Sequence, residues 1–323
     1  MESSRRQALY LTAAAALLPV MSRFAWADNY PSRPVRLIEG YPPGLTPDIV
    51  ARLIAQSLSE RLGQEFIVDN RPGAGSNLAA EMVIKSAPDG YTLLVMTITN
   101  TVNATLYKNL TFDIGHDIAP VIATFRSPLV MIINPSMPFR TVPEFIAYAK
   151  ANPGKINYGS PGYGTANHMA GELFRVLTGI ELVHIPYRGS YMPDLLAGQT
   201  QVTWSPLATS LEFVKAGKLV VIAVTGAMRS EALPDIPAVA ETVPGYEYSV
   251  WHGIGAPKDT PTDVIGKLNA EINKVLVDPK IKARFAEVGG AAIGGSPADY
   301  GKLIADETVK WAKVVRTANL KAE

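Results

Sequence analysis

The sequence predicts an α/β protein of two halves followed by a helical C-terminal segment. Short runs of β-branched residues alternate with segments of helical periodicity, which is typical of β-α-β units. The chain of 323 residues has the length of two compact domains at roughly 100–200 residues each. Its hydrophobic content of 47%, against 18% charged residues, is ample for two cores, so we do not expect a disordered chain.

The first 27 residues have the pattern of a signal peptide. Arg5 and Arg6 give the positive start, Ala8 to Val20 the apolar run, and Ala25-Trp26-Ala27 the small-residue cleavage pattern. The apolar run is shorter than the ~20 residues that span a bilayer, and no later stretch reaches that length. Residues 4–9 also approximate a twin-arginine motif, so the general secretory route and the twin-arginine route both remain open. We therefore expect an exported mature chain; a buried N-terminal helix is the alternative.

The first half of the mature chain is predicted to contain three strands and two helices. The expected strands are Val35–Ile38, Phe66–Val68 and Leu93–Met96, and the expected helices are Pro47–Leu62 and Leu78–Ala87. Proline suits the first turn of a helix, and Gly63 suits the position just after its end. Two consecutive right-handed crossovers place these strands on a largely parallel sheet.

The second half repeats this alternation after Val121-Ile122-Ala123. The expected strands are Leu129–Ile133, Ile156–Tyr158, Leu182–Ile185, Val202–Trp204 and Leu219–Val224, and the expected helices are Val142–Ala151, Thr165–Thr178 and Met192–Ala197. The chain then leaves through Tyr248–Trp251 and ends in three amphipathic helices, Val264–Val277, Pro279–Val288 and Pro297–Ala318. We expect this tail to return to the first half.

Composition excludes several classes of function. Without cysteine the chain has no disulfide, thiolate metal site, iron–sulfur cluster or cysteine nucleophile. A formal net charge of +1, which becomes −1 when residues 1–27 are removed, offers no field for a nucleic-acid backbone. The four histidines, His116, His168, His184 and His252, form no metal-binding motif. We therefore expect no metal, no cofactor and no nucleic-acid partner.

Three motifs of enzymes and nucleotide-binding proteins are approached but not completed. A nucleophile elbow around Ser160 would need glycine where Tyr158 stands. Residues 73–75 lack the third glycine of a dinucleotide fingerprint. The turn that begins at Gly159 has the spacing of a phosphate loop, but Thr165 replaces its lysine.

Three glycine-rich turns, each between an expected strand and an expected helix, give the strongest indication of binding. They are Tyr41–Asp48, Arg71–Asn77 and Gly159–Thr165. The first turn of a helix offers unpaired N–H donors and about half a positive charge, so such a turn holds a carboxylate without Arg or Lys. For any single turn, tight chain reversal is a sufficient reason for the glycines. Two turns in opposite halves, however, indicate one anion bound between two lobes.

These segments resemble the Bug-type solute-binding proteins, the extracytoplasmic receptors of tripartite tricarboxylate transporters. The resemblance covers essentially the whole mature chain and rests on Tyr30–Arg36, Pro42–Gly44, Asp48–Arg52, Asp69–Gly75, Ala87–Leu94, Tyr158–Gly162 with Gly164–Thr165, His168–Phe174, His184–Gly189 and Gly253–Pro257. It implies a two-lobed periplasmic-binding-protein architecture (Venus-flytrap, type II-like), each lobe a mixed sheet flanked by helices. Lobe 1 would comprise residues 28–125 plus 249–323, and lobe 2 residues 126–248.

The resemblance also implies the ligand contacts, made mainly by backbone amides, hydroxyls and bridging water. In lobe 1 they are Tyr41, Pro43, Gly44 and Leu45, with Asp48 ordering the loop; in lobe 2 they are Ser160, Gly164 and Thr165, followed by Asn167, His168, Tyr187 and Arg188. Leu45 stands where the family usually has a second glycine. Because leucine lacks glycine's freedom at positive φ, we expect a different loop shape or a different ligand.

Two further questions stay open at this point. Arg188 stands where the family commonly has lysine, and it is either a solvated surface charge or a partner for a second carboxylate. Trp204, Trp251 and Tyr163 are either core packing or an aromatic wall of the pocket.

The function implied is that of a monomeric periplasmic receptor that captures a small organic carboxylate by lobe closure. It would deliver a dicarboxylate, an aromatic carboxylate or a similar acid to a membrane permease, without covalent chemistry. One alternative is an orphan sensor that presents its closed form to a sensor kinase. The other is an enzyme of small carboxylates that uses Ser160 or Asp48.

Overall fold

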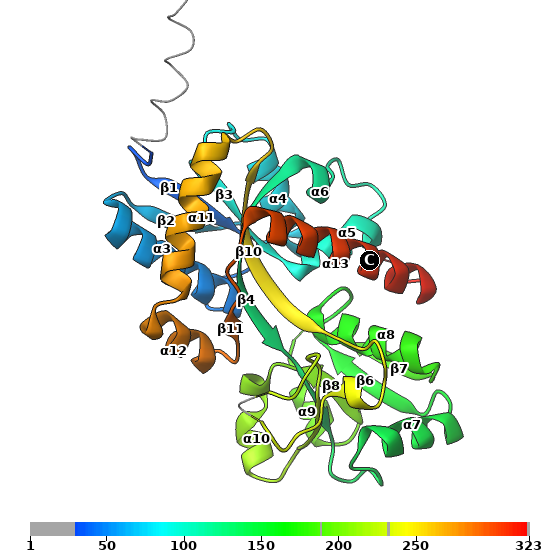
Figure 1. The fold of residues 1–323 in the computed structure, drawn as a ribbon. Coiled ribbons are helices and arrows are strands. Elements are labelled where there is room, and N and C mark those ends of the chain that lie inside the picture. The colour runs from blue at the N-terminus through cyan, green and yellow to red at the C-terminus, as the bar shows by residue number, and fades with distance from the viewer. Residues whose placement is uncertain (1–29, 188, 231–232, 322–323) are drawn as a thin grey trace, which may run out of the picture.

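The computed structural model describes residues 30–187, 189–230 and 233–321. It shows two α/β lobes, each with one sheet flanked by helices, joined by long strands (Figure 1). The predicted α/β class with two lobes is therefore confirmed. The predicted signal peptide, residues 1–27, and Arg188 lie outside the described residues.

The first lobe is built on a six-stranded sheet with the order β11-β4-β10-β3-β1-β2. Its parallel part consists of β1 (Val35–Glu39), β2 (Phe66–Asn70) and β3 (Thr92–Thr97), and the crossovers contain α3 (Thr46–Leu62) and α4 (Asn77–Ile84). Pro47 lies in the first turn of α3, and Gly63 follows its end in the left-handed region with φ of 68°. Both helix signals in the sequence thus act as predicted.

The other part of this sheet is antiparallel, so the sheet is mixed, as the resemblance implied, and the parallel arrangement expected from the crossovers is confined to β1, β2 and β3. Strand β10 (Ser249–Pro257) lies between β3 and β4 (Ile118–Pro128) and is antiparallel to both. Strand β11 (Ala291–Ala292) adds an edge. The crossover pattern of the first half could not reveal β10, because this strand returns from a distant part of the chain.

The second lobe is built on a five-stranded sheet with the order β7-β6-β8-β5-β9. Its strands are β5 (Val130–Ile133), β6 (Ile156–Ser160), β7 (Leu182–Pro186), β8 (Val202–Ser205) and β9 (Val220–Val224), and its helices are α7 (Val142–Ala151), α8 (Ala166–Thr178), α9 (Met192–Leu196) and α10 (Leu211–Lys215). All five strands were predicted, as were α7, α8 and α9. The short α10 was not predicted.

The chain crosses between the lobes along β4 and β10, which pair over their whole lengths. Leu129 follows β4 directly and leads into β5. The lobe boundaries at 125/126 and 248/249 stay a prediction; the first falls within β4 and the second just before β10. These two strands form the floor between the lobes.

The C-terminal helices are α11 (Thr262–Leu276), α12 (Pro279–Glu287) and α13 (Pro297–Thr317). Helix α11 packs on α3 and β4, so the tail returns to the first lobe as predicted. Helix α13 lies across the junction of the two lobes (Figure 1). Its Trp311 and Val315 belong to one buried cluster that also contains Leu94 of the first lobe and Phe174 of the second. The two lobes therefore share part of their hydrophobic core.

Two helices of the first lobe were not predicted. They are α5 (Ile98–Leu106) and α6 (Ile114–Asp117). The segment of α5 is rich in β-branched residues and asparagine, which are weak helix formers, so periodicity alone gave no helix.

Candidate functional site

A cavity of about 360 Å³ lies between the two lobes and is lined by both. The first-lobe wall comes from the starts of α3 and α5. The second-lobe wall comes from Tyr163–Ala166 together with Pro206 and Thr209. The floor is formed by side chains of the crossing strands, Phe125, Ser127, Val250 and His252, with Leu129. We call this space the interlobe cavity.

The N-termini of three helices meet at the interlobe cavity. Leu45, Thr97 and Thr165 are the N-cap residues of α3, α5 and α8; α3 and α8 have no side-chain cap, whereas α5 begins with a capping pair of Thr97 and Asn100. All three line the cavity, and no lining residue in the described part of the chain is charged. Because unpaired first-turn N–H groups carry a partial positive charge, the cavity attracts an anion without a cationic side chain.

The side chain of Asp48 holds the first-lobe loop in place. Its buried carboxylate accepts hydrogen bonds from Gly44 N at 2.9 Å, Arg52 Nε at 3.0 Å and Asn70 Nδ2 at 2.9 Å. Burial alone would raise the pKa of Asp48, but these hydrogen bonds together lower it below its ordinary value. Asp48 is therefore ionised and holds the loop in place. Its carboxylate already accepts the hydrogen bond that the Gly44 N–H group can donate.

Leu45 adopts ordinary extended geometry, with φ of −79° and ψ of 161°. The expected cost of leucine at a positive φ does not arise here, because the left-handed residue of this loop is Gly44, with φ of 87°. Leu45 lines the cavity and is 48% exposed. Beside it, the Tyr41 hydroxyl donates to Thr99 Oγ1 at 2.7 Å and ties the loop to the start of α5.

The second-lobe loop is held by its own side chains. Thr165 Oγ1 donates to the Gly162 carbonyl at 2.7 Å, and Ser160 Oγ accepts from Gly162 N at 3.0 Å. His168 Nδ1 accepts from Gly164 N at 3.0 Å. Nδ1 accepts a hydrogen bond only when the imidazole is neutral and carries its proton on Nε2, so the loop geometry depends on an unprotonated His168.

Burial keeps the histidines under this loop neutral. Burial lowers the pKa of His168 to about 4, with a further contribution from the charge of Arg175. Burial and the neighbouring His168 lower the pKa of His184 to about 3, against the opposing charge of Glu172. The two rings lie 4.1 Å apart between centroids. The loop therefore rests on a neutral ring pair at pH 7.

Gly164 is the point where the second-lobe loop meets the first lobe. Its φ is 73°, and a Cβ at this position would lie 2.9 Å from Leu106 Cδ2 on α5. Both residues line the cavity. The absence of a side chain at Gly164 thus permits the close approach of the two lobes.

Several predicted site residues support the loops and do not line the cavity in the described chain. Pro43 and Gly44 lie exposed on the first loop. Asn167 is buried and donates to the Tyr191 hydroxyl at 3.1 Å, and the Tyr187 hydroxyl donates to Asp194 Oδ2 at 2.6 Å. Ser160, His168 and Asp48 hold the loops as described above. Tyr41, Leu45, Gly164 and Thr165 do line the cavity.

Burial shows which of Trp204, Trp251 and Tyr163 are core residues and which one lines the cavity. Trp204 and Trp251 are 0% and 1% exposed and are not among the residues lining the cavity, so they are core packing. Tyr163 lines the cavity and is 42% exposed. It is the aromatic wall residue of the three.

Sequence reasoning missed the contribution of α5 and of the floor. Thr97, Ile98 and Thr99 at the start of α5 line the cavity, as do Phe125 and His252. The one available signal was Thr97 with Asn100 three residues later, a spacing that suits a helix start. In the structure the Thr97 N–H group donates to Asn100 Oδ1 at 2.9 Å.

Ser160 has a histidine neighbour but lacks the surroundings of a nucleophile. Its Oγ lies 2.7 Å from His184 Nε2, yet Ser160 is fully buried and does not line the cavity. His184 Nδ1 has no hydrogen-bond partner among the described residues, so no acid orients the ring. The pair stabilises the loop rather than performing catalysis.

Residues 30–187, 189–230 and 233–321 contain neither a metal-binding cluster nor a membrane-crossing helix. No group of three or more His, Asp or Glu side chains there is arranged to hold a metal ion. None of the helices in these ranges has both the length and the apolar character needed to cross a bilayer.

Comparison with known proteins gives the family of this chain. The model of the family described as "Tripartite tricarboxylate transporter family receptor" matches residues 50–320. The protein BugT of Bordetella pertussis is 34% identical over 300 residues, which cover 91% of this chain and 92% of BugT.

Two solved structures share the fold over nearly their full lengths. R. palustris Rpa4515 with adipate is 36% identical with a TM-score of 0.78, covering 90% of this chain and 99% of that one. MatC (Rpa3494) from Rhodopseudomonas palustris with bound malate is 26% identical with a TM-score of 0.75, covering 88% and 100%.

Proposed function

Because this chain belongs to the tripartite tricarboxylate transporter family of receptors, we propose that it captures a small organic carboxylate in the interlobe cavity and delivers it to a tripartite tricarboxylate-type membrane permease. The family is the one predicted from the sequence. The chain is a receptor by family and not an enzyme, which removes the alternative based on Ser160 or Asp48. In this proposal the receptor works in the periplasm after removal of the predicted signal peptide.

One observation carries the proposal. Three helix N-termini, two of them without a side-chain cap, face a cavity that no charged side chain lines among the described residues. A carboxylate suits this arrangement because it accepts several N–H bonds and gains from each helix end, typically by about 0.3–1 kcal/mol. The adipate and malate in the two similar structures support the same ligand class.

The rest of the cavity indicates a ligand with an apolar body. Ile98, Leu106 and Phe125 contribute its walls and floor, together with Leu129 and Val250. The volume of about 360 Å³ lies at the lower end of the roughly 300–1,000 Å³ of small-molecule sites. We therefore propose an aliphatic dicarboxylate or an aromatic carboxylate whose carboxylate lies at the helix ends and whose apolar body lies over the floor.

Lobe closure follows from the position of the ligand. A carboxylate that bonds both to the starts of α3 and α5 and to the start of α8 favours the closed form, because only a contact that differs between states shifts their populations. The crossing strands β4 and β10 are the elements about which the lobes would move.

The proposal predicts stabilisation by a carboxylate ligand. We expect at least one acid in a screen of aliphatic dicarboxylates and aromatic monocarboxylates to raise the melting temperature, because a ligand that binds only the folded state stabilises it by RT ln(1 + [L]/Kd). The matched amides and alcohols, which lack the charge, should leave it unchanged. Calorimetry then gives the affinity. A screen in which amides stabilise as well as acids would contradict the role of the helix ends.

Thr165 gives a test of the second-lobe loop. We expect Thr165→Ala to weaken carboxylate binding by about 10-fold, because the hydroxyl that bonds the Gly162 carbonyl is lost and the loop is less well ordered. Thr165→Ser keeps the hydroxyl and should retain affinity to within about 3-fold. Calorimetry on both variants decides: equal losses for serine and alanine would assign the effect to the methyl group and not to the hydrogen bond.

A further inference from the structure

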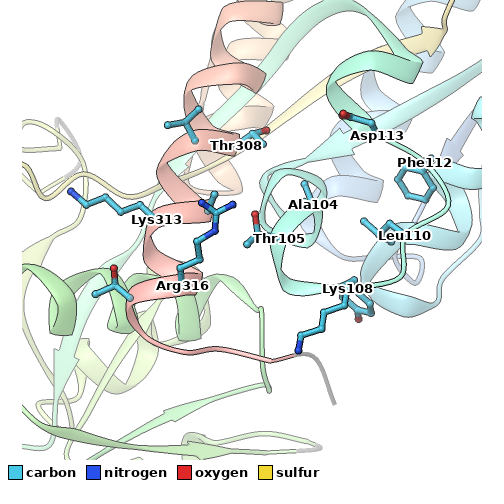
Figure 2. Close-up of a pocket in the computed structure, with 13 residues that line it drawn as sticks. Ala104, Thr105, Lys108, Leu110, Phe112, Asp113, Thr308, Lys313 and Arg316 are labelled. Atoms are coloured by element: carbon cyan, nitrogen blue, oxygen red, sulfur yellow. The ribbon is translucent and has the colours of Figure 1, made fainter.

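A second pocket, of about 800 Å³, lies between α13 and the end of α5. We call it the α5–α13 pocket. The lining residues that matter here are Lys108, Leu110, Phe112, Asp113, Lys313 and Arg316. Figure 2 shows Arg316 extending from α13 toward α5, with Lys313 and Lys108 on either side of it.

Three cationic side chains of the pocket have no hydrogen-bond or ion-pair partner within the described residues. The side chains of Lys108, Lys313 and Arg316 are exposed and form no hydrogen bond or ion pair within the described residues. Nearby on the same helix, Lys302 and Lys310 are paired with Asp306 and Glu307. A local excess of unpaired positive charge therefore stands out on a chain whose overall charge is close to zero.

The single acidic residue in the lining does not neutralise these cations. Asp113 is the N-cap of α6, and its Oδ1 accepts from Gly115 N at 2.9 Å. Apolar groups complete the pocket: Leu110 and Phe112 are partly exposed, and Val309 is 72% exposed. The lining thus combines a positive rim with apolar contacts, the composition that suits a protein segment bearing acidic and apolar residues.

We propose that the α5–α13 pocket docks an acidic, partly apolar segment of the membrane permease, an inference that rests on the proposed function. The cations are spread around an open pocket (Figure 2) rather than converging on one point, which favours an extended segment over a single small ion. The charge complementarity steers the encounter, and the apolar lining residues add contacts with the bound segment.

The walls of this pocket are also connected to the interlobe cavity. Helix α5 begins at the cavity and ends at the pocket, and Tyr107 lines both. Leu106 on α5 approaches Gly164 of the second lobe, and α13 packs against both α5 and α8. A partner in the pocket thus contacts two helices whose surroundings change on lobe closure, which provides a physical route for the permease to distinguish the loaded receptor.

The test compares two triple variants of the mature receptor with the same change in charge. The first, Lys108→Gln, Lys313→Gln and Arg316→Gln, neutralises the pocket. The control, Lys150→Gln, Lys155→Gln and Lys218→Gln, removes three other exposed cations without partners in the described chain. The probe is a fluorescently labelled peptide of about 12 residues that alternates Glu and Leu, and its affinity is measured by anisotropy at low and physiological salt.

We expect the pocket variant to bind the peptide at least 10-fold more weakly than the parent and the control to remain within about 2-fold. Equal losses in both variants would show attraction to net charge alone and overturn the proposal. The proposal would also be overturned if inorganic phosphate abolished peptide binding at matched ionic strength, because the site would then be one for small anions. Absence of peptide binding by the parent receptor would also overturn it.

A second measurement connects the pocket to transport. In vesicles that contain the permease, we expect the pocket variant to lower carboxylate uptake at least 10-fold while calorimetry shows an unchanged Kd for the carboxylate. Unchanged uptake would refute docking at this pocket. Failure of the parent receptor to bind any carboxylate would instead refute the proposed function, so the two failures are distinguishable.

Discussion

Gly164→Ala is expected to weaken carboxylate binding by at least about 10-fold, as measured by calorimetry. The position has φ of 73°, and its new Cβ would lie 2.9 Å from Leu106 Cδ2 across the interlobe cavity. A left-handed conformation costs a non-glycine residue roughly 1–2 kcal/mol with or without ligand, so this cost lowers stability and not affinity. The contact with Leu106 opposes lobe closure, and a penalty of about 1.4 kcal/mol in the closed form corresponds to a factor of 10 in affinity.

The chain offers a matched control at the other end of the same helix. Gly179 follows α8 with φ of 67°, and a Cβ there would meet no atom within 4 Å. Gly179→Ala should cost similar stability and leave the affinity unchanged. Leu106→Ala, combined with Gly164→Ala, should restore part of the lost affinity. Equal affinities for the two glycine variants would remove Gly164 from the closure contact.

The sequence was most informative where local rules act alone. Helix α3 begins with Pro47 and ends before Gly63, and helix α8 begins after the glycine turn and ends before Gly179. Proline and glycine impose backbone geometry wherever they stand, so these helix ends could be predicted without knowledge of the fold. The same turns place two of the three helix N-termini of the cavity.

The third helix N-terminus depended on tertiary structure. Helix α5 consists of weak helix formers, and it is stabilised by burial of Ile98, Val102 and Leu106 in the shared core. The antiparallel position of β10 likewise comes from pairing with strands far away in the chain. Neither feature leaves a local pattern, and together they supply the start of α5 and His252 in the cavity lining.

Within the loops, the sequence indicated the right segments but could not separate contact from support. Thr165 and Gly164 line the cavity, whereas Ser160 and His168 hold the same loop through hydrogen bonds. Which side chain turns toward the cavity is decided by backbone geometry over a few residues. Spacing along the chain does not contain that information.

Acidification is expected to destabilise the receptor strongly between about pH 6.5 and about pH 4. Burial lowers the pKa of His252 to about 3 and that of His168 to about 4, and half-buried His184 is lowered to about 3. These rings are neutral in the folded chain but take up protons near pH 6.5 when unfolded. Below that pH the unfolded state binds more protons, so the free energy of unfolding falls as pH falls toward the folded-state pKa values.

His252→Phe is the variant that tests this expectation. His252 is 1% exposed, stacks on Phe125, and has no hydrogen-bond partner for either ring nitrogen in the described chain. Phenylalanine keeps an aromatic ring without a proton to gain, so the fall in unfolding free energy between about pH 6.5 and pH 4 should shrink by at least about 1.4 kcal/mol, the value of one pKa unit. Denaturant unfolding at several pH values measures this slope for the parent and the variant. If His252→Phe retained the full slope, protonation of the buried His252 ring would not be a cause of the acid sensitivity.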